Sequence, residues 1–163
     1  NILTGERRCV FLKRRVNPIF ILVIFLLSIT IILILFSTFL FSSERQAKNA
    51  IYDFYELEQS GSFSESWEML HPFMQEKFTK DNYIEMKPHV FFNHMGVTSF
   101  QFKLDGMKKL NDWYMEEGKE SIDEVYRSTV EKDFKSRFGN LTIRQYVYAT
   151  HVDGEWKILW NYK

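Results

Sequence analysis

Hydrophobic positions divide the chain into one continuous apolar run and a longer stretch of helical and alternating patterns. The run from Ile19 to Phe41 holds 23 residues without a charge. As a helix that rises about 1.5 Å per residue, it would reach roughly 34 Å and cross a hydrocarbon core of about 30 Å. The pattern therefore predicts a transmembrane helix over residues 19–41, a stub over residues 1–18 and a domain over residues 42–163.

The first half of that domain has apolar residues at helical spacing, punctuated by helix-capping residues. The positions that define one face of the first helix are Ala47, Ala50, Ile51, Phe54 and Leu57. Gly61 suits a C-terminal cap, and Ser62 to Glu65 has the spacing of a capping box that opens a second helix. Pro72 marks either a break or a new first turn. Asp81 can cap a further helix that Pro88 interrupts, so we expect about three helices.

The second half of the domain changes to the period of β-strands. Phe100 to Leu104 alternates apolar and polar residues and leads to a predicted turn at Asp105-Gly106. Ile122 to Phe134 and Leu141 to Val152 predict two long strands. Asp153-Gly154 then gives the strongest hairpin signal of the chain, before a short strand with alternating tryptophans. Helices followed by four or five antiparallel strands predict an α+β fold with the helices on one face of the sheet.

The flanks of the apolar run favour a retained anchor over a cleaved signal peptide. Phe39 and Phe41 occupy the place where a small-residue cleavage site would lie, and the run is longer than the core of a signal peptide. Cys9 precedes the run, so it is not the lipidated cysteine of a lipoprotein signal. Five basic residues and one acid precede the run. The positive-inside rule therefore predicts a cytoplasmic N-terminus, contact of Ile19–Phe41 with membrane lipid, and a domain outside the cytoplasm.

Charge and composition narrow the chemistry of the domain. Residues 44–163 carry 16 Lys and Arg against 20 Asp and Glu, a balance of −4 that does not suit a nucleic-acid surface. The seven glycines are isolated, which excludes a phosphate-cradling loop. His89 and His94 are five residues apart and would not share a helix face as a zinc pair does. We therefore expect no metal, no cofactor and no catalytic motif.

Two local motifs, together with the order of the elements, resemble the nuclear-transport-factor-two-like superfamily. The first is Ser66 to Pro72, and the second is the terminal Asp153 to Trp160, which looks like an ending common in bacterial extracytoplasmic members. The chain is also similar to the N-terminal, non-catalytic domain of some membrane-anchored penicillin-binding proteins. The resemblance covers about residues 46–162 and implies a cone-like domain of helices on a curved, mainly antiparallel sheet. A transpeptidase needs a Ser-x-x-Lys motif, and the sequence has none.

The resemblance also indicates where a ligand would bind, because enzymes of this superfold use the cavity between sheet and helices. The candidate cavity-lining residues are Tyr52, Tyr55, Tyr126, Gln145 and His151. Gln145 and His151 alternate in register with Leu141, Ile143 and Val147, which places them toward the apolar interior. A polar side chain there either has a hydrogen-bonding partner or lines a pocket.

Two further groups of residues are interpreted as surface features. Trp113 and Tyr114 are candidates for an exposed contact on a looser strand. Lys132, Lys135 and Arg137 form a local basic cluster that we interpret as a solvated edge.

Three functions remain open at this point. The first is a single-pass membrane protein whose non-catalytic outer domain binds another envelope protein or a second copy of itself. The second is a ligand-binding or enzymatic cavity in the cone. The third is an inner-membrane scaffold of a conjugation or secretion machine.

Overall fold

The computed structural model describes residues 17–40, 42–89, 96–97 and 99–162, and it divides the chain into two compact units, residues 1–40 and 41–163. The first unit contains helix α1, Pro18–Leu40. Its window from Pro18 to Phe36 has a mean hydropathy of 3.4, and none of it is buried. The helix is long and apolar enough to cross a membrane, and a signal sequence near an N-terminus meets the same criteria.

Among the residues that the structure describes, four helices open the second unit. They are α2 (Ser43–Ser60), α3 (Phe63–Glu68), α4 (Pro72–Lys77) and α5 (Lys80–Pro88). Helix α2 ends at Gly61, which has a φ of 84° and donates its backbone N–H to the last turn, as the sequence predicted. Pro72 is the first residue of α4, so it begins a separate helix and raises the expected count from about three to four.

Two of the predicted helix caps are wrong in detail. Ser62 does precede α3, but its side chain makes no capping hydrogen bond, so the expected capping box is not formed. Thr79, and not Asp81, is the residue that precedes α5, and Asp81 lies in the first turn of this helix. A carboxylate in the first turn still stabilises a helix through the helix dipole, even where the carboxylate forms no capping hydrogen bond.

The sheet has four antiparallel strands in the order β1-β2-β3-β4. Their bounds are β1 (Phe100–Trp113), β2 (Ile122–Ser136), β3 (Gly139–Val152) and β4 (Glu155–Leu159). Asp153 and Gly154 form the turn between β3 and β4 with φ values of 51° and 88°, which confirms the predicted hairpin. Leu70 adds an isolated parallel bridge to Ile158 of β4.

The predicted turn at Asp105-Gly106 is wrong. Strand β1 continues through these residues, and the register against β2 shifts between Asp105 and Lys108. Gly106 has a φ of 63°, so the turn signal marks a bulge inside one long strand rather than the end of it.

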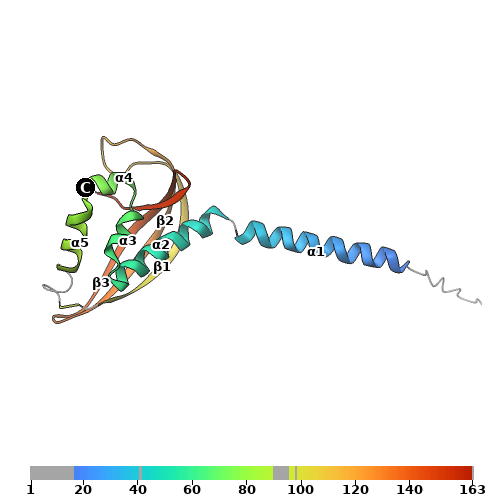
Figure 1. Ribbon diagram of the computed structural model, residues 1–163, viewed down its shortest axis with the longest axis horizontal. Coiled ribbons are helices and arrows are strands. Elements are labelled where there is room, and N and C mark those ends of the chain that lie inside the picture. Colours follow the sequence, from blue (N-terminus) through green and yellow to red (C-terminus); the bar gives the residue numbers. More distant parts are fainter. Residues whose placement is uncertain (1–16, 41, 90–95, 98, 163) are drawn as a thin grey trace, which may run out of the picture. The chain divides into compact units, whose positions relative to one another are not determined.

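The helices pack on one face of the sheet, and the core lies between them (Figure 1). Ile51 and Phe54 of α2 are buried against a sheet face that carries buried Val130, Val147 and Ile158. Successive strand residues point to opposite faces, so the register assigns the even-numbered residues of β2 from 126 to 134 to the covered face. The α+β fold and the antiparallel sheet with helices on one face are thus confirmed.

Candidate functional site

The two predicted tyrosines of α2 lie one beside the other over strand β1. Tyr55 is buried and Tyr52 is exposed, and their rings lie 5.6 and 5.1 Å from the ring of Phe102. Burial raises the pKa of the Tyr55 hydroxyl far above its ordinary value, so Tyr55 stays neutral. Tyr52 therefore forms the exposed rim of this contact and Tyr55 its buried floor.

Tyr126 and His151 meet at a different place, around Trp156. The Trp156 ring lies edge to face with both side chains, at 5.7 Å from Tyr126 and 5.2 Å from His151. These three residues line a surface hollow of about 280 Å³. The Tyr126 hydroxyl donates to Glu124 at 2.7 Å, and His151 is exposed. The structure therefore brings two of the five predicted cavity residues together, at a shallow and open site.

Gln145 lies apart from that hollow, on the covered face of the sheet. It pairs with the fully buried Val130 of β2, and its own side chain is half-buried. The Gln145 amide has no hydrogen-bonding partner among the residues that the structure describes. The described residues contain no buried side-chain nitrogen or oxygen without a hydrogen-bonding partner, so the half-buried Gln145 amide is satisfied by contact with solvent.

The two candidate contact residues differ in exposure. Tyr114 is 58% exposed. Trp113 is half-buried, with its ring 4.2 Å from that of Tyr148 on β3. Nearby, Tyr162 donates its backbone N–H to the carbonyl of Met115, which ties the segment after β1 to the end of the chain. Trp113 therefore contributes to packing, and Tyr114 is the more exposed of the two.

A polar cluster that sequence reasoning missed lies between the helices and the sheet. Its centre is Glu58 of α2, which is only 6% exposed. The Glu58 carboxylate accepts hydrogen bonds from Ser66 at 2.8 Å and Tyr83 at 2.6 Å, and it pairs with the ammonium of Lys87 at 2.5 Å. These three donors satisfy the buried carboxylate, as the cost of burying a charge requires. We define these four residues as the Glu58 cluster.

Lys132 faces the same space from strand β2, so the interpretation of it as part of a solvated edge is wrong. Its side chain is half-buried, and its Nζ lies 5.3 Å from the centre of the Tyr55 ring. Burial, reinforced by the charge of Lys87, lowers the pKa of Lys132 to about 8. The sequence contained this information. Alternate residues of a strand face the same side of the sheet, and Lys132 alternates with the apolar Val130 and Phe134.

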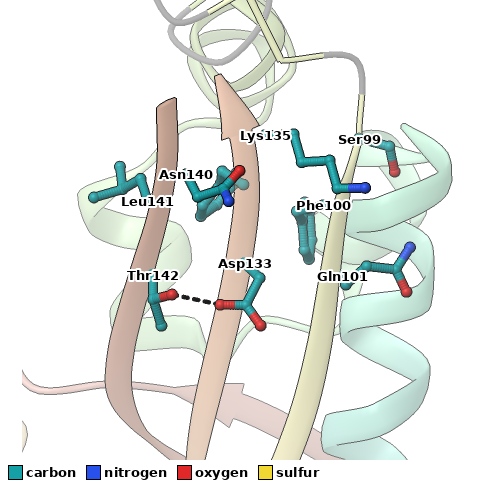
Figure 2. Close-up of a pocket in the computed structure, with 9 residues that line it drawn as sticks. Ser99, Phe100, Gln101, Asp133, Lys135, Asn140, Leu141 and Thr142 are labelled. Carbon is teal, nitrogen blue, oxygen red and sulfur yellow. Dashed lines mark hydrogen bonds between the residues drawn. The ribbon is translucent and has the colours of Figure 1, made fainter. Parts of the chain in front are cut away.

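A second hollow, of about 390 Å³, lies at the far end of the strands (Figure 2). The Asp133 carboxylate accepts a hydrogen bond from Thr142 at 2.5 Å across β2 and β3, which Figure 2 shows as a dashed line. Lys135 lies beside it with an exposed side chain. No predicted site residue lines this hollow, and its carboxylate already has a partner.

The three locations offer different chemistry. The two hollows are surface features with hydrogen-bonded acids, whereas Lys132, beside the Glu58 cluster, lies over the Tyr55 ring and has no hydrogen bond or ion pair among the described residues. Comparison of the sequence with models of protein families found no match, and comparison with curated proteins found none either.

Proposed function

We propose that this chain is a single-pass membrane protein whose domain over residues 42–163 acts outside the cytoplasm as a non-catalytic module for protein binding or assembly at the cell envelope. The observation that carries the proposal is α1, whose described side chains are exposed and, apart from Ser28 and Thr30, apolar. An uncharged helix of 23 residues is stable where its surface meets lipid and not water.

The orientation comes from the charges beside the helix. Basic residues are concentrated before α1, and the domain that follows is acidic. The positive-inside rule supports a domain outside the cytoplasm. The resemblance to the nuclear-transport-factor-two-like superfamily is part of the same proposal, and helices packed on one face of an antiparallel sheet agree with it.

The face of the sheet away from the helices is the surface that we propose for the partner. Its central residues are charged or aromatic: Glu131 contacts Lys103 and Arg144, and Arg127 lies 4.4 Å over the ring of Tyr146. Tyr146 is 52% exposed. Exposed aromatic and arginine side chains are enriched in protein interfaces.

Cysteine labelling in intact cells tests the anchor and its orientation. The native Cys9 is the only cysteine of the chain, and Ser121→Cys adds a thiol at an exposed position of the domain in a Cys9→Ser background. We expect a membrane-impermeant maleimide to label the Ser121→Cys protein in intact cells and to label Cys9 of the unchanged chain only after lysis. Loss of residues 1–41 from the mature protein would contradict the anchor, and the reverse labelling would contradict the orientation.

Photocrosslinking in living cells tests the binding role. A photoreactive amino acid at Tyr146 should capture a defined partner or a second copy of the chain, whereas the same group at the exposed Glu56 of α2 should not. A purified protein that stays monomeric, combined with no capture from Tyr146, would overturn the proposed binding role.

A further inference from the structure

The open face of the sheet carries polar side chains in rows that cross three strands. Gln101 of β1 pairs with Asp133 of β2, and Asp133 pairs with Thr142 of β3. Two residues further along β2, Lys135 pairs with Asn140 of β3. The even-numbered residues of β2 lie on the covered face, so Asp133 and Lys135 both lie on the open one. These residues therefore form two adjacent polar rows at one end of the sheet.

The row next to these two is different, because its charges are paired within the row. Glu131 lies between Lys103 and Arg144 and forms an ion pair with each of them. In the neighbouring row, Thr142 donates to Oδ1 of Asp133 at 2.5 Å, and the other carboxylate oxygen is turned away from Thr142 (Figure 2). That oxygen accepts no hydrogen bond from the residues that the structure describes. Asp133 can therefore accept a hydrogen bond from a ligand.

The two polar rows border the hollow of about 390 Å³ at this end of the strands (Figure 2). Six of its nine lining residues have polar side chains, and all six are exposed: Ser99, Gln101, Asp133, Lys135, Asn140 and Thr142. Within the described part of the chain, the Lys135 ammonium and the two amides make no hydrogen bond with the protein. Of the three apolar lining residues, Leu141 is 39% exposed, and Phe100 and Phe134 are buried. The hollow thus presents mainly donors and acceptors to a ligand, and little apolar surface.

This lining favours an uncharged ligand that is rich in hydroxyl groups. One acid and one base line the hollow, so their formal charges cancel, and neither an anion nor a cation gains a net attraction. Small-molecule sites are usually lined mainly by apolar side chains, so a mainly polar lining does not suit an apolar ligand. A hydroxyl group both donates and accepts hydrogen bonds, so it can pair with a carboxylate, an ammonium or an amide. A saccharide presents several such groups on one rigid ring.

An exposed aromatic ring adjoins the polar rows. Phe138 belongs to the turn between Ser136 and Gly139, which form the last pair of β2 and β3, and the next pair of the ladder is Lys135 with Asn140. Phe138 is 84% exposed, the highest value among the large hydrophobic residues that the structure describes. A ring with so little cover offers an apolar surface to a ligand. The C–H face of a sugar ring matches such a surface.

We propose that this hollow binds a short, uncharged saccharide. Asp133 accepts a hydrogen bond from one hydroxyl of the sugar, and Lys135 and Asn140 donate hydrogen bonds to others. A second sugar ring extends along the ladder to Phe138, where its C–H face covers the exposed aromatic ring. The ion-paired row separates this site from Tyr146, so the inference goes beyond the proposed role in protein binding and does not depend on it.

Saturation-transfer NMR of the full chain in phospholipid nanodiscs tests the proposal. The probes are four uncharged disaccharides: maltose, cellobiose, lactose and chitobiose. We expect saturation transfer from the protein to at least one of them, with a saturable dependence on its concentration, and no transfer from empty nanodiscs. The absence of transfer to all four would overturn the proposal.

Charged probes distinguish a saccharide site from an ion site. Glucosamine and glucuronate keep the sugar ring and add a positive or a negative charge, and neither should bind more than about twofold more tightly than glucose. Glycine, a zwitterion whose two charges complement Asp133 and Lys135, should not displace the bound disaccharide. A larger gain from either charge, or displacement by glycine, would overturn the proposal.

Three variants locate the site, and a fourth is their control. Asp133→Ala should weaken binding of the disaccharide at least tenfold, because it removes a charged acceptor. Asn140→Ala and Phe138→Ala should each weaken it about threefold. Asp105→Ala is the matched control, since Asp105 is an exposed aspartate on the same face of the sheet and lies outside the hollow. It should change the affinity less than twofold.

Two results with these variants would also overturn the proposal. They are an unchanged affinity in Asp133→Ala and a loss in Asp105→Ala as large as that in Asp133→Ala. Tryptophan fluorescence shows whether each variant is folded. If Asp133→Ala fails to fold, Phe138→Ala decides, because Phe138 lies in an exposed turn, and an unchanged affinity in that variant would then overturn the proposal.

Discussion

Two glutamates on opposite sides of the sheet have similar exposure and different surroundings. Glu58 is 6% exposed and Glu131 is 9% exposed. Glu58 is enclosed by Ser66, Tyr83 and Lys87 beneath the helices. Glu131 lies on the open face and is covered by its own ion-pair partners, Lys103 and Arg144, whose side chains are 64% and 72% exposed. Similar exposed fractions thus describe a carboxylate in the interior and one that lies beneath solvated surface cations.

This difference shows that the groups that cover a carboxylate determine how much its charge contributes to the stability of the fold. Protein atoms around Glu58 lower the local dielectric, so the loss of one partner leaves a charge that water reaches only in part. Around Glu131, water reaches the partner cations and screens their interaction. The covered face should therefore respond strongly to a change of charge, and the open face weakly.

The largest effect should come from Glu58. The substitution Glu58→Gln preserves shape but leaves Lys87 without its counter-ion beneath the helices. We expect a loss of about 3 kcal/mol in the free energy of unfolding, since breaking a buried pair by removing one partner is strongly destabilising. Chemical denaturation of the full chain in detergent micelles, followed by tryptophan fluorescence, measures it.

The matched control for this substitution is Glu56→Gln, which changes an exposed carboxylate on the same helix. Its unfolding midpoint should stay within the error of the measurement. Equal effects of the two substitutions would show that the Glu58 cluster does not behave as a buried pair.

A smaller effect of opposite sign should come from Lys132. The substitution Lys132→Met replaces a half-buried cation that has no counter-ion among the described residues with an apolar side chain of similar length. We expect the free energy of unfolding at pH 7 to rise by about 2 kcal/mol, because the cost of burying the charge disappears. Lys135→Met on the same strand should leave it unchanged, and a loss of stability in Lys132→Met would contradict the unpaired state of this ammonium.

The pH dependence of stability is an independent test of the burial of Lys132. Burial lowers the pKa of Lys132 from 10.5 to about 8, so between these values the unfolded chain binds more protons than the folded one. The stability of the wild-type chain should therefore rise with pH over this window, relative to Lys132→Met. The difference between the two proteins should be full below the lowered pKa and close to zero once the pH reaches 10.5. A constant difference across the window would show that Lys132 titrates normally.

Sequence patterns predicted the elements of this fold better than their contacts. The alternation of β3, the turn at Asp153-Gly154 and the cap at Gly61 depend on local backbone preferences, so they are readable from a few residues. Asp105-Gly106 carries a similar signal but forms a bulge, because long-range pairing with β2 overrides the local turn preference.

The candidate site depended on contacts between distant parts of the chain, which no local pattern encodes. Glu58 sits on an amphipathic helix, where a solvated acid is the usual interpretation, and its partners Ser66 and Lys87 lie 8 and 29 residues away. Lys132 was grouped with its sequence neighbours Lys135 and Arg137 as a basic cluster. The alternation of residues along β2 predicts its position better than the neighbouring charges do, because it places Lys132 on the covered face of the sheet.

The smallest effect should come from Glu131, which completes the comparison. Hydrogen bonds from Lys103 and Arg144 hold the pKa of the Glu131 carboxyl below its ordinary value of 4.5. The stabilisation is therefore present above pH 4.5 and is lost as the pH falls through the lowered pKa. At pH 7, Glu131→Gln should lower the melting temperature by no more than about 2 °C, and about 1 M salt should remove most of the difference. A salt-independent loss as large as that of Glu58→Gln would show that the open face is covered by a part of the protein or by a partner.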